Sequence, residues 1–136
     1  SIAARDVEFS PDGSRMYIGG FQTGEIHSVE LDDNYDFAGP PTLFASISGC
    51  NWMDGLGVDI CGNLYAPCWD LSSLFRISPA GDVETLVDWS DNSSLYGHNL
   101  EWGSGVSGWD SRSLYMPQPY DDGTVVRVEI GVPYRE

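Results

Sequence analysis

One stretch of the sequence carries most of the information about the fold: Met53-Asp54-Gly55-Leu56-Gly57-Val58-Asp59, followed by Gly62-Asn63-Leu64-Tyr65-Ala66. Two short apolar segments flank a Gly-Asn turn, which is the pattern of a tight antiparallel hairpin. The stretch therefore predicts two strands joined by a turn.

The same unit recurs on both sides of this stretch. The earlier copy runs from Val7-Glu8-Phe9 through a Pro-Asp-Gly turn to Met16-Tyr17-Ile18. The later copy runs from Leu100-Glu101-Trp102 through a longer Gly/Ser-rich connection to Leu114-Tyr115-Met116. The anchor tyrosines Tyr17, Tyr65 and Tyr115 are spaced by 48 and 50 residues. A nearly fixed period of this length indicates a repeat architecture.

Each copy continues with an alternating third segment, at 25–29, 74–77 and 125–128. A fourth follows in the first two copies, whereas the third copy ends at Ile130-Gly131-Val132-Pro133. Short strands in such a period, without helical periodicity, predict an all-β protein with the β-propeller fold. We expect three four-stranded blades, at about 1–49, 50–96 and 97–136, the last incomplete. An antiparallel β-sandwich shares the alternation and the turns, but it does not require an in-register repeat.

Three blades are too few to close a ring, because propellers use about four to eight. We therefore expect this single unit to be half of a six-bladed propeller. The partner that completes it is another half-propeller, either a second copy in a homodimer or N-terminal blades missing from this chain.

The charge of the chain limits its partners. The 136 residues include 21 Asp and Glu against six Arg and no Lys, for a formal net charge of −15. Nucleic acids and anionic membranes bind clusters of Lys and Arg, so we expect neither as a partner. No run of apolar residues is long enough for a membrane span. The absence of Lys also excludes a Schiff-base lysine.

Two motifs resemble the family of senescence marker protein, gluconolactonase and luciferin-regenerating enzyme. They are Phe9-Ser10-Pro11-Asp12-Gly13 with Met16-Tyr17-Ile18, and Met53–Asp59 with Gly62-Asn63-Leu64-Tyr65. The ending Gly123–Val132 also looks like the last strand of that family. The resemblance covers essentially the whole chain, as blades four to six of a six-bladed propeller.

The resemblance implies an enzyme that hydrolyses a lactone or related ester with the help of one divalent cation, Ca or Zn, and no organic cofactor. The metal-binding residue it implies is Asp54, in the Asp-Gly-Leu step. It also implies an Asn ligand four residues before Phe9, where this chain has Arg5. A guanidinium cannot ligate a metal, and its charge opposes one.

The repeat itself makes Arg5, Asp54 and His98 equivalent, because each precedes an innermost strand by the same offset. Converging on one axis, they predict a site for a small anion or carbonyl group, with Asp54 or His98 as the catalytic base and Arg5 as a substrate-binding clamp. The alternative is structural: Asp54 caps a turn, His98 packs beneath Trp102 and Arg5 pairs with an acidic neighbour.

Further candidates for substrate binding flank these positions: Asn51, Trp52 and Asn99. Trp and Asn stack on and orient small polar ligands. A Trp in a propeller more often packs between blades, so that interpretation of Trp52 stays open.

The three cysteines lie within 19 positions of one another. Strand pairing brings Cys68 close to Cys50, which favours this pair as a disulfide and leaves Cys61 free. Three buried thiols are the alternative. A disulfide would imply an oxidising compartment, which slightly favours a secreted or periplasmic location over the cytoplasm.

Two functions follow from these observations. The first is a gluconolactonase-like, metal-dependent hydrolase of small-molecule substrates, possible only if the ring is completed. The second is a noncatalytic propeller module, in which Arg5 has replaced a ligand and the channel binds a small anion or a protein partner.

Overall fold

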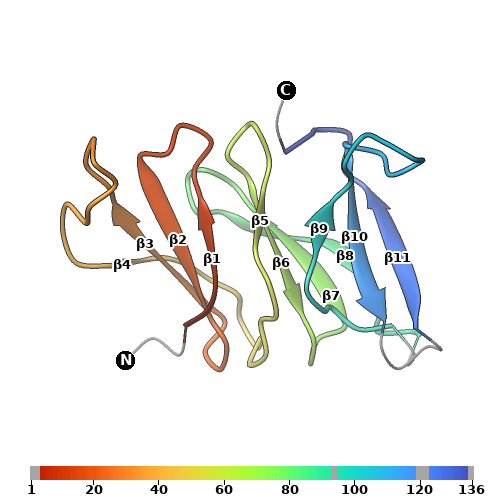
Figure 1. Cartoon of the computed structure of the whole chain (residues 1–136). Helices are drawn as coiled ribbons and strands as arrows, with labels where there is room; N and C mark the ends of the chain where they lie inside the picture. The colour runs from red at the N-terminus through yellow and green to blue at the C-terminus, as the bar shows by residue number, and fades with distance from the viewer. Residues whose placement is uncertain (1–3, 93–94, 119–122, 135–136) are drawn as a thin grey trace.

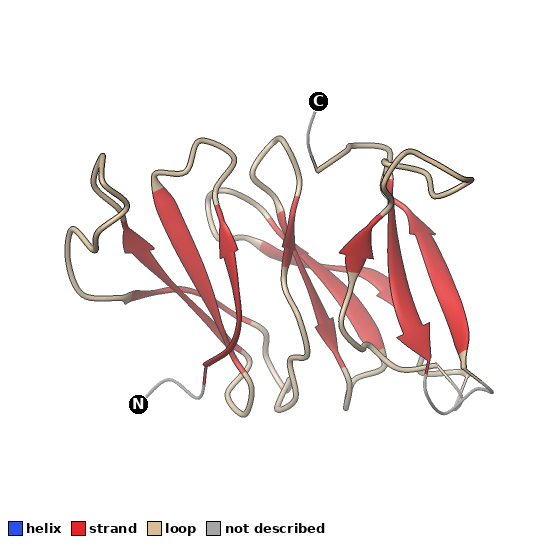
Figure 2. Cartoon of the chain, in the orientation of Figure 1, coloured by secondary structure: helices blue, strands red, loops and turns tan. Residues whose placement is uncertain are grey.

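The computed structural model describes residues 4–92, 95–118 and 123–134. These residues form strands and loops, and none of them is helical (Figure 2). Accordingly, no helix in the described ranges is long and apolar enough to cross a membrane. The strands are β1 Ala4–Phe9, β2 Arg15–Gly20, β3 Glu25–Glu30, β4 Thr42–Ser46, β5 Gly57–Val58, β6 Leu64–Cys68, β7 Ser73–Ile77, β8 Val83–Asp88, β9 Glu101–Trp102, β10 Ser113–Gln118 and β11 Thr124–Glu129.

The strands form three antiparallel sheets, each built from strands that follow one another in the chain (Figure 1). Their orders are β1-β2-β3-β4, β5-β6-β7-β8 and β11-β10-β9. The sheet of β5 to β8 lies between the other two (Figure 1). The prediction of an all-β chain with three successive sheets is therefore confirmed.

The third sheet has three strands rather than four in the part of the chain that the structure describes, as expected for an incomplete last copy of the repeat. The segment that follows β11 is irregular. Gly131 has a φ of 83°, which turns the chain out of the extended conformation. Pro133 has no N–H to donate to a neighbouring strand. These two residues explain why the segment 130–134 does not continue as a strand.

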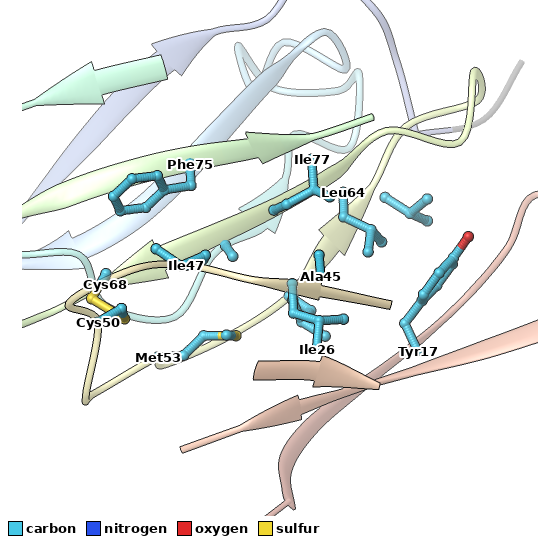
Figure 3. Close-up of a cluster of buried hydrophobic side chains, with 13 residues drawn as sticks. Tyr17, Ile26, Ala45, Ile47, Cys50, Met53, Leu64, Cys68, Phe75 and Ile77 are labelled. Carbon is cyan, nitrogen blue, oxygen red and sulfur yellow. A yellow bond between two sulfur atoms is a disulfide. The ribbon is translucent and has the colours of Figure 1, made fainter. Parts of the chain in front are cut away.

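Strands β5 to β7 of the middle sheet are buried on both faces. On β6, Leu64 and Ala66 join an apolar cluster with Tyr17 and Ile26 of the first sheet (Figure 3). Tyr65, between them, points the other way and packs with Leu114 and other residues of the third sheet. Because successive side chains on a strand alternate in direction, one apolar run supplies both interfaces.

The β5–β6 hairpin is held by a buried carboxylate, Asp59, with no exposed surface. It accepts hydrogen bonds from the backbone N–H groups of Cys61 and Asn63, from the Asn63 side chain and from the Tyr65 hydroxyl, at 2.8–2.9 Å. Burial, with this bond to Asp59, raises the pKa of Tyr65 above its ordinary value. The turn therefore depends on an acceptor that no neutral apolar residue can replace.

Aspartates also hold the matching hairpins of the other sheets. Asp12 accepts hydrogen bonds from the hydroxyls of Ser10 and Ser14 and from the Ser14 N–H. These bonds, that of Ser10 first, lower the pKa of Asp12 to about 2. In the third sheet, Asp110 accepts from Ser113 and Arg127. In each of the three sheets, an aspartate carboxylate thus holds the turn between the first two strands.

We expect Asp59→Ala to lower the free energy of unfolding by about 3 kcal/mol, because it leaves several buried donors without an acceptor. Urea denaturation followed by tryptophan fluorescence measures the change. Asp33→Ala, at an exposed position, is the control and should stay within about 0.5 kcal/mol of the unmodified chain. Equal effects of the two substitutions would contradict this role of Asp59.

The lowered pKa of Asp12 predicts a defined pH dependence. A carboxylate whose pKa is lower in the folded state stabilises that state above its unfolded pKa of 3.8, and the contribution disappears as the pH falls through about 2. The stability difference between the unmodified chain and Asp12→Ala should therefore shrink from pH 5 to about pH 2. A difference that stays constant over this range, measured by urea denaturation, would refute the assignment.

Candidate functional site

The three positions that the repeat makes equivalent come together on one carboxylate. Arg5 Nε donates to Asp54 Oδ1 at 2.8 Å, and His98 Nδ1 lies 3.1 Å from Asp54 Oδ2. Arg5 belongs to β1, whereas Asp54 and His98 precede β5 and β9. These three strands run in the same direction (Figure 1), so the residues at their beginnings meet at one end of the molecule.

A short antiparallel contact with the end of β6 determines the side to which the Asp54 side chain points. The N–H of Asp54 donates to Pro67 O at 3.2 Å, and Met53 forms a β-bridge with Cys68. Met53 is buried in the apolar cluster between the first and the middle sheet. Because neighbouring side chains in an extended segment point to opposite sides, Asp54 and Trp52 face away from that core. Alternation thus places the acidic group and an indole on one side of the segment.

Gly55 lets the chain turn directly after Asp54. Its φ of 131° lies in a region that L side chains rarely adopt. A Cβ there would also lie 2.9 Å from the Asn99 side-chain oxygen. This glycine therefore allows the segments that carry Asp54 and His98 to approach each other.

Exposure sets Arg5 apart from the other two residues. The Arg5 side chain is 49% exposed, whereas those of Asp54 and His98 are 18% and 17% exposed. The His98 Nε2 atom is buried, and its Nδ1 faces Asp54. His98 is therefore placed to orient the carboxylate, and Arg5 is the most accessible of the three groups. The catalytic role predicted for Asp54 and His98 stays a prediction.

The predicted flanking residues have other partners. Asn51 donates from its backbone and side chain to Asp70, with Nδ2 2.8 Å from Oδ2. Asn99 Oδ1 accepts from the Leu100 N–H at 2.9 Å. Both asparagines are thus engaged in shaping the loops around Asp54. Their role in substrate binding stays a prediction.

Trp52 belongs to a row of stacked rings. Its ring centroid lies 4.5 Å from that of Trp69, which lies 5.2 Å from that of Tyr96. On the other side, Phe21 lies 6.2 Å from Trp52 and carries the Arg5 guanidinium carbon 4.5 Å from its centroid. Sequence reasoning did not include Phe21 or Tyr96, because they come from loops without a common motif.

Asp70 organises the site from the loop that follows β6. It accepts hydrogen bonds from the backbone N–H groups of Asn51 and Trp52 at 3.1–3.2 Å. These bonds hold the segment that leads to Asp54 against the end of β6. The signal in the sequence was the Trp69-Asp70 pair that follows this strand.

Cys50 and Cys68 form a disulfide, with their Cα atoms 6.0 Å apart (Figure 3). Cys61 is a free, exposed cysteine. This is the pairing that the strand positions favoured, and it rules out three buried thiols in this structure. The bond ties the segment before Asp54 to the end of β6.

The described residues do not fit a divalent cation by themselves. One oxygen of Asp54 already forms an ion pair with the Arg5 guanidinium, and this positive charge repels a cation at the same site. Within the described residues, no third His, Cys, Asp or Glu joins Asp54 and His98 in a ligand cluster. Cys50, Cys68 and Asp70 do cluster, but both sulfurs are consumed by the disulfide. Asp54 as a metal ligand remains a prediction.

We expect Cys50→Ser with Cys68→Ser to lower the free energy of unfolding by about 3 kcal/mol, because the disulfide closes a loop across a separation of 18 residues. Denaturation in urea measures the loss. Cys61→Ser is the matched control and should change stability little. Titration of the unfolded, unreduced chain should find one thiol, and a result of three would contradict the pairing.

Comparison with a known family gives a match over more than half of the chain. Residues 6–94 match the family described as "SMP-30/Gluconolactonase/LRE-like region". No curated protein sequence matches the chain.

Solved structures give a similar picture at low sequence identity. Regucalcin from Agrobacterium tumefaciens, a calcium-binding protein, is 17% identical, with a TM-score of 0.73 over 99% of this chain and 48% of its own. A luciferin-regenerating enzyme is 17% identical, with a TM-score of 0.72 over 98% and 47%. A gluconolactonase from Xanthomonas campestris is 16% identical, with a TM-score of 0.72 over 97% and 38%.

These structures share the fold of this chain, which spans less than half the length of each. The three sheets, the Asp-Gly-Leu step at Asp54 and the matched residues 6–94 agree with one another. The chain belongs to the SMP-30/gluconolactonase/LRE-like family.

Proposed function

We propose that this chain is half of a six-bladed propeller, completed by a second copy or by preceding blades. The outer face of the first sheet supports this proposal, because Val7, Phe9 and Leu43 are 46–58% exposed there. A cleft of about 750 Å³ continues this apolar surface, between Phe9, Met16, Leu31, Tyr35, Phe37 and their neighbours. Exposed apolar surface of this extent is typical of a face that packs against another unit.

We propose that the completed protein hydrolyses lactones or related esters, with Asp54 as the base. The observation that carries the proposal is a partly exposed carboxylate oriented by His98 and flanked by the Arg5 guanidinium, in a chain of this family. Each carboxylate oxygen can accept more than one hydrogen bond, so Asp54 can also hold a water molecule.

The proposed reaction uses Asp54 as the base and Arg5 as the group that binds the carbonyl oxygen. Asp54 takes a proton from the water as its oxygen bonds to the lactone carbonyl carbon. N–H groups of Arg5 stabilise the negative charge that develops on the carbonyl oxygen. The bond from this carbon to the ring oxygen breaks, and that oxygen receives the proton from Asp54. The product is a hydroxy acid.

The family resemblance implies a Ca or Zn ion at Asp54, which would polarise the carbonyl group when bound. Since the described residues do not form a cation site by themselves, its other ligands would have to come from the other half of the ring. No step of the mechanism above depends on it.

A noncatalytic binding module is the second candidate, and one observation favours it. Arg5 neutralises the carboxylate that the family resemblance assigns to a metal. In this case the site at Asp54 and Arg5 would bind a small anion or a partner loop without turnover.

We also propose an oxidising location, secreted or periplasmic, for the protein. The disulfide between Cys50 and Cys68 supports it, because such bonds persist mainly outside reducing compartments.

The proposed function predicts that Asp54→Asn lowers kcat/KM for lactone opening about 100-fold, because the amide cannot accept the proton of water. The assay uses the assembled protein, with light scattering to verify a mass above 14.9 kDa. His98→Gln should cause a smaller loss, because it affects only the orientation of Asp54. Asp33→Asn is the control.

Two outcomes would decide against this function. An unchanged rate in Asp54→Asn would remove the base from the mechanism. Assembled protein that opens no lactone, contains no metal by elemental analysis and keeps its thermal stability in a chelator would favour the noncatalytic module.

A further inference from the structure

The row of aromatic rings borders the Asp54 site directly. Arg5 contacts both Asp54, at 2.8 Å, and the ring of Phe21, at 4.5 Å. Trp52 comes two residues before Asp54 in the extended segment, so both face the same side. The row and the carboxylate therefore share one wall.

The row is held in place in its middle and at its Tyr96 end. The Asp70 carboxylate fixes the backbone of Trp52, with which Trp69 also forms a backbone hydrogen bond of 2.9 Å. At the far end, the buried Gln118 of β10 forms two hydrogen bonds with the backbone of Tyr96, at 2.9 and 3.0 Å. Trp52, Trp69 and Tyr96 come from different loops, and these hydrogen bonds hold their backbones in place without a ligand.

Part of this row remains open beside Asp54. Trp52 is 43% exposed, although it stacks on Trp69. On its other side Trp52 stacks with Phe21, with 6.2 Å between the centroids and 21° between the ring planes. The exposed part of the indole is therefore the part that these two neighbouring rings leave uncovered.

Arg5 adds hydrogen-bond donors at the Phe21 end of the row, beside Asp54. Its bond to Asp54 uses Nε, and the side chain is half exposed. The terminal nitrogens of a guanidinium carry four further N–H groups. A planar molecule on Trp52 could thus place a carbonyl oxygen against Arg5.

We infer that Trp52 and Arg5 form a subsite for a carbonyl compound with an adjoining aromatic ring, so the preferred substrates are aryl lactones rather than polyhydroxylated sugar lactones. An indole face stacks on a flat ring, and the guanidinium binds the carbonyl oxygen. The inference rests on the proposed function only in the choice of a lactone, since binding itself needs no turnover.

The test compares two neutral lactams that cannot be hydrolysed under the conditions of binding. 3,4-Dihydro-2-quinolinone and 2-piperidone share the six-membered lactam ring, and the first carries a fused benzene ring in addition. Calorimetry with the assembled protein gives the two affinities, and the indole N–H signals in NMR show which Trp is affected. We expect the aryl lactam to bind about tenfold more tightly.

The variants separate stacking from carbonyl binding. Trp52→Leu should abolish the preference for the aryl lactam, and Trp52→Phe should keep part of it if the leucine variant does not fold. Arg5→Gln should weaken both lactams alike. Trp109→Leu is the matched control, because Trp109 is 45% exposed but lies outside the row.

Equal affinities for the two lactams, or equal effects of Trp52→Leu and Trp109→Leu, would overturn the inference. If the aryl lactam binds through Trp52 but no lactone is opened, the subsite stands and the proposed hydrolase fails. If aryl and sugar lactones are opened at equal kcat/KM, and Trp52→Leu changes neither, the hydrolase stands and the subsite fails.

Discussion

The Asp54 carboxylate is the point at which all three sheets meet. It receives Arg5 from the first sheet and faces His98, which leads into the third, while its own segment leads into the second. A further link, from the Leu56 N–H to Asp6 Oδ2 at 2.8 Å, joins the first two sheets beside it. Without these contacts the beginnings of β1, β5 and β9 would have no common partner, and the candidate site would not exist.

The neighbourhood of Asp54 is rigid for several independent reasons. The disulfide, the bridge between Met53 and Cys68 and the hydrogen bonds to Asp70 all act on the same short segment. Each restricts the conformations available to residues 50–54. Groups held in this way keep their geometry when a ligand binds, which favours a site that is formed in advance.

Positive charge is scarce in this chain, and its position is therefore informative. Arg15, Arg76 and Arg127 pair with carboxylates at exposed strand positions, where such pairs contribute little to stability. Arg5 differs, because it lies between a partly buried carboxylate and an aromatic ring. At a net charge of −15, a guanidinium fixed beside the site is the group that can attract a carbonyl oxygen or a small anion.

The sequence by itself determined the local elements and their repetition. Alternating apolar residues and Gly turns gave the hairpins, and the spacing of Tyr17, Tyr65 and Tyr115 gave the three sheets. Equal offsets within the repeat also brought Arg5, Asp54 and His98 into one group, because equivalent positions of adjacent sheets lie at the same end.

Only the tertiary structure decided what these residues contact. The stack from Phe21 to Tyr96 joins loops of different length, so no spacing in the sequence indicates it. The burial of His98 Nε2 and the pairing of Asn51 with Asp70 depend on how the sheets pack. Periodicity specifies which side of a strand a residue occupies, whereas the partner on that side is set by segments far away in the chain.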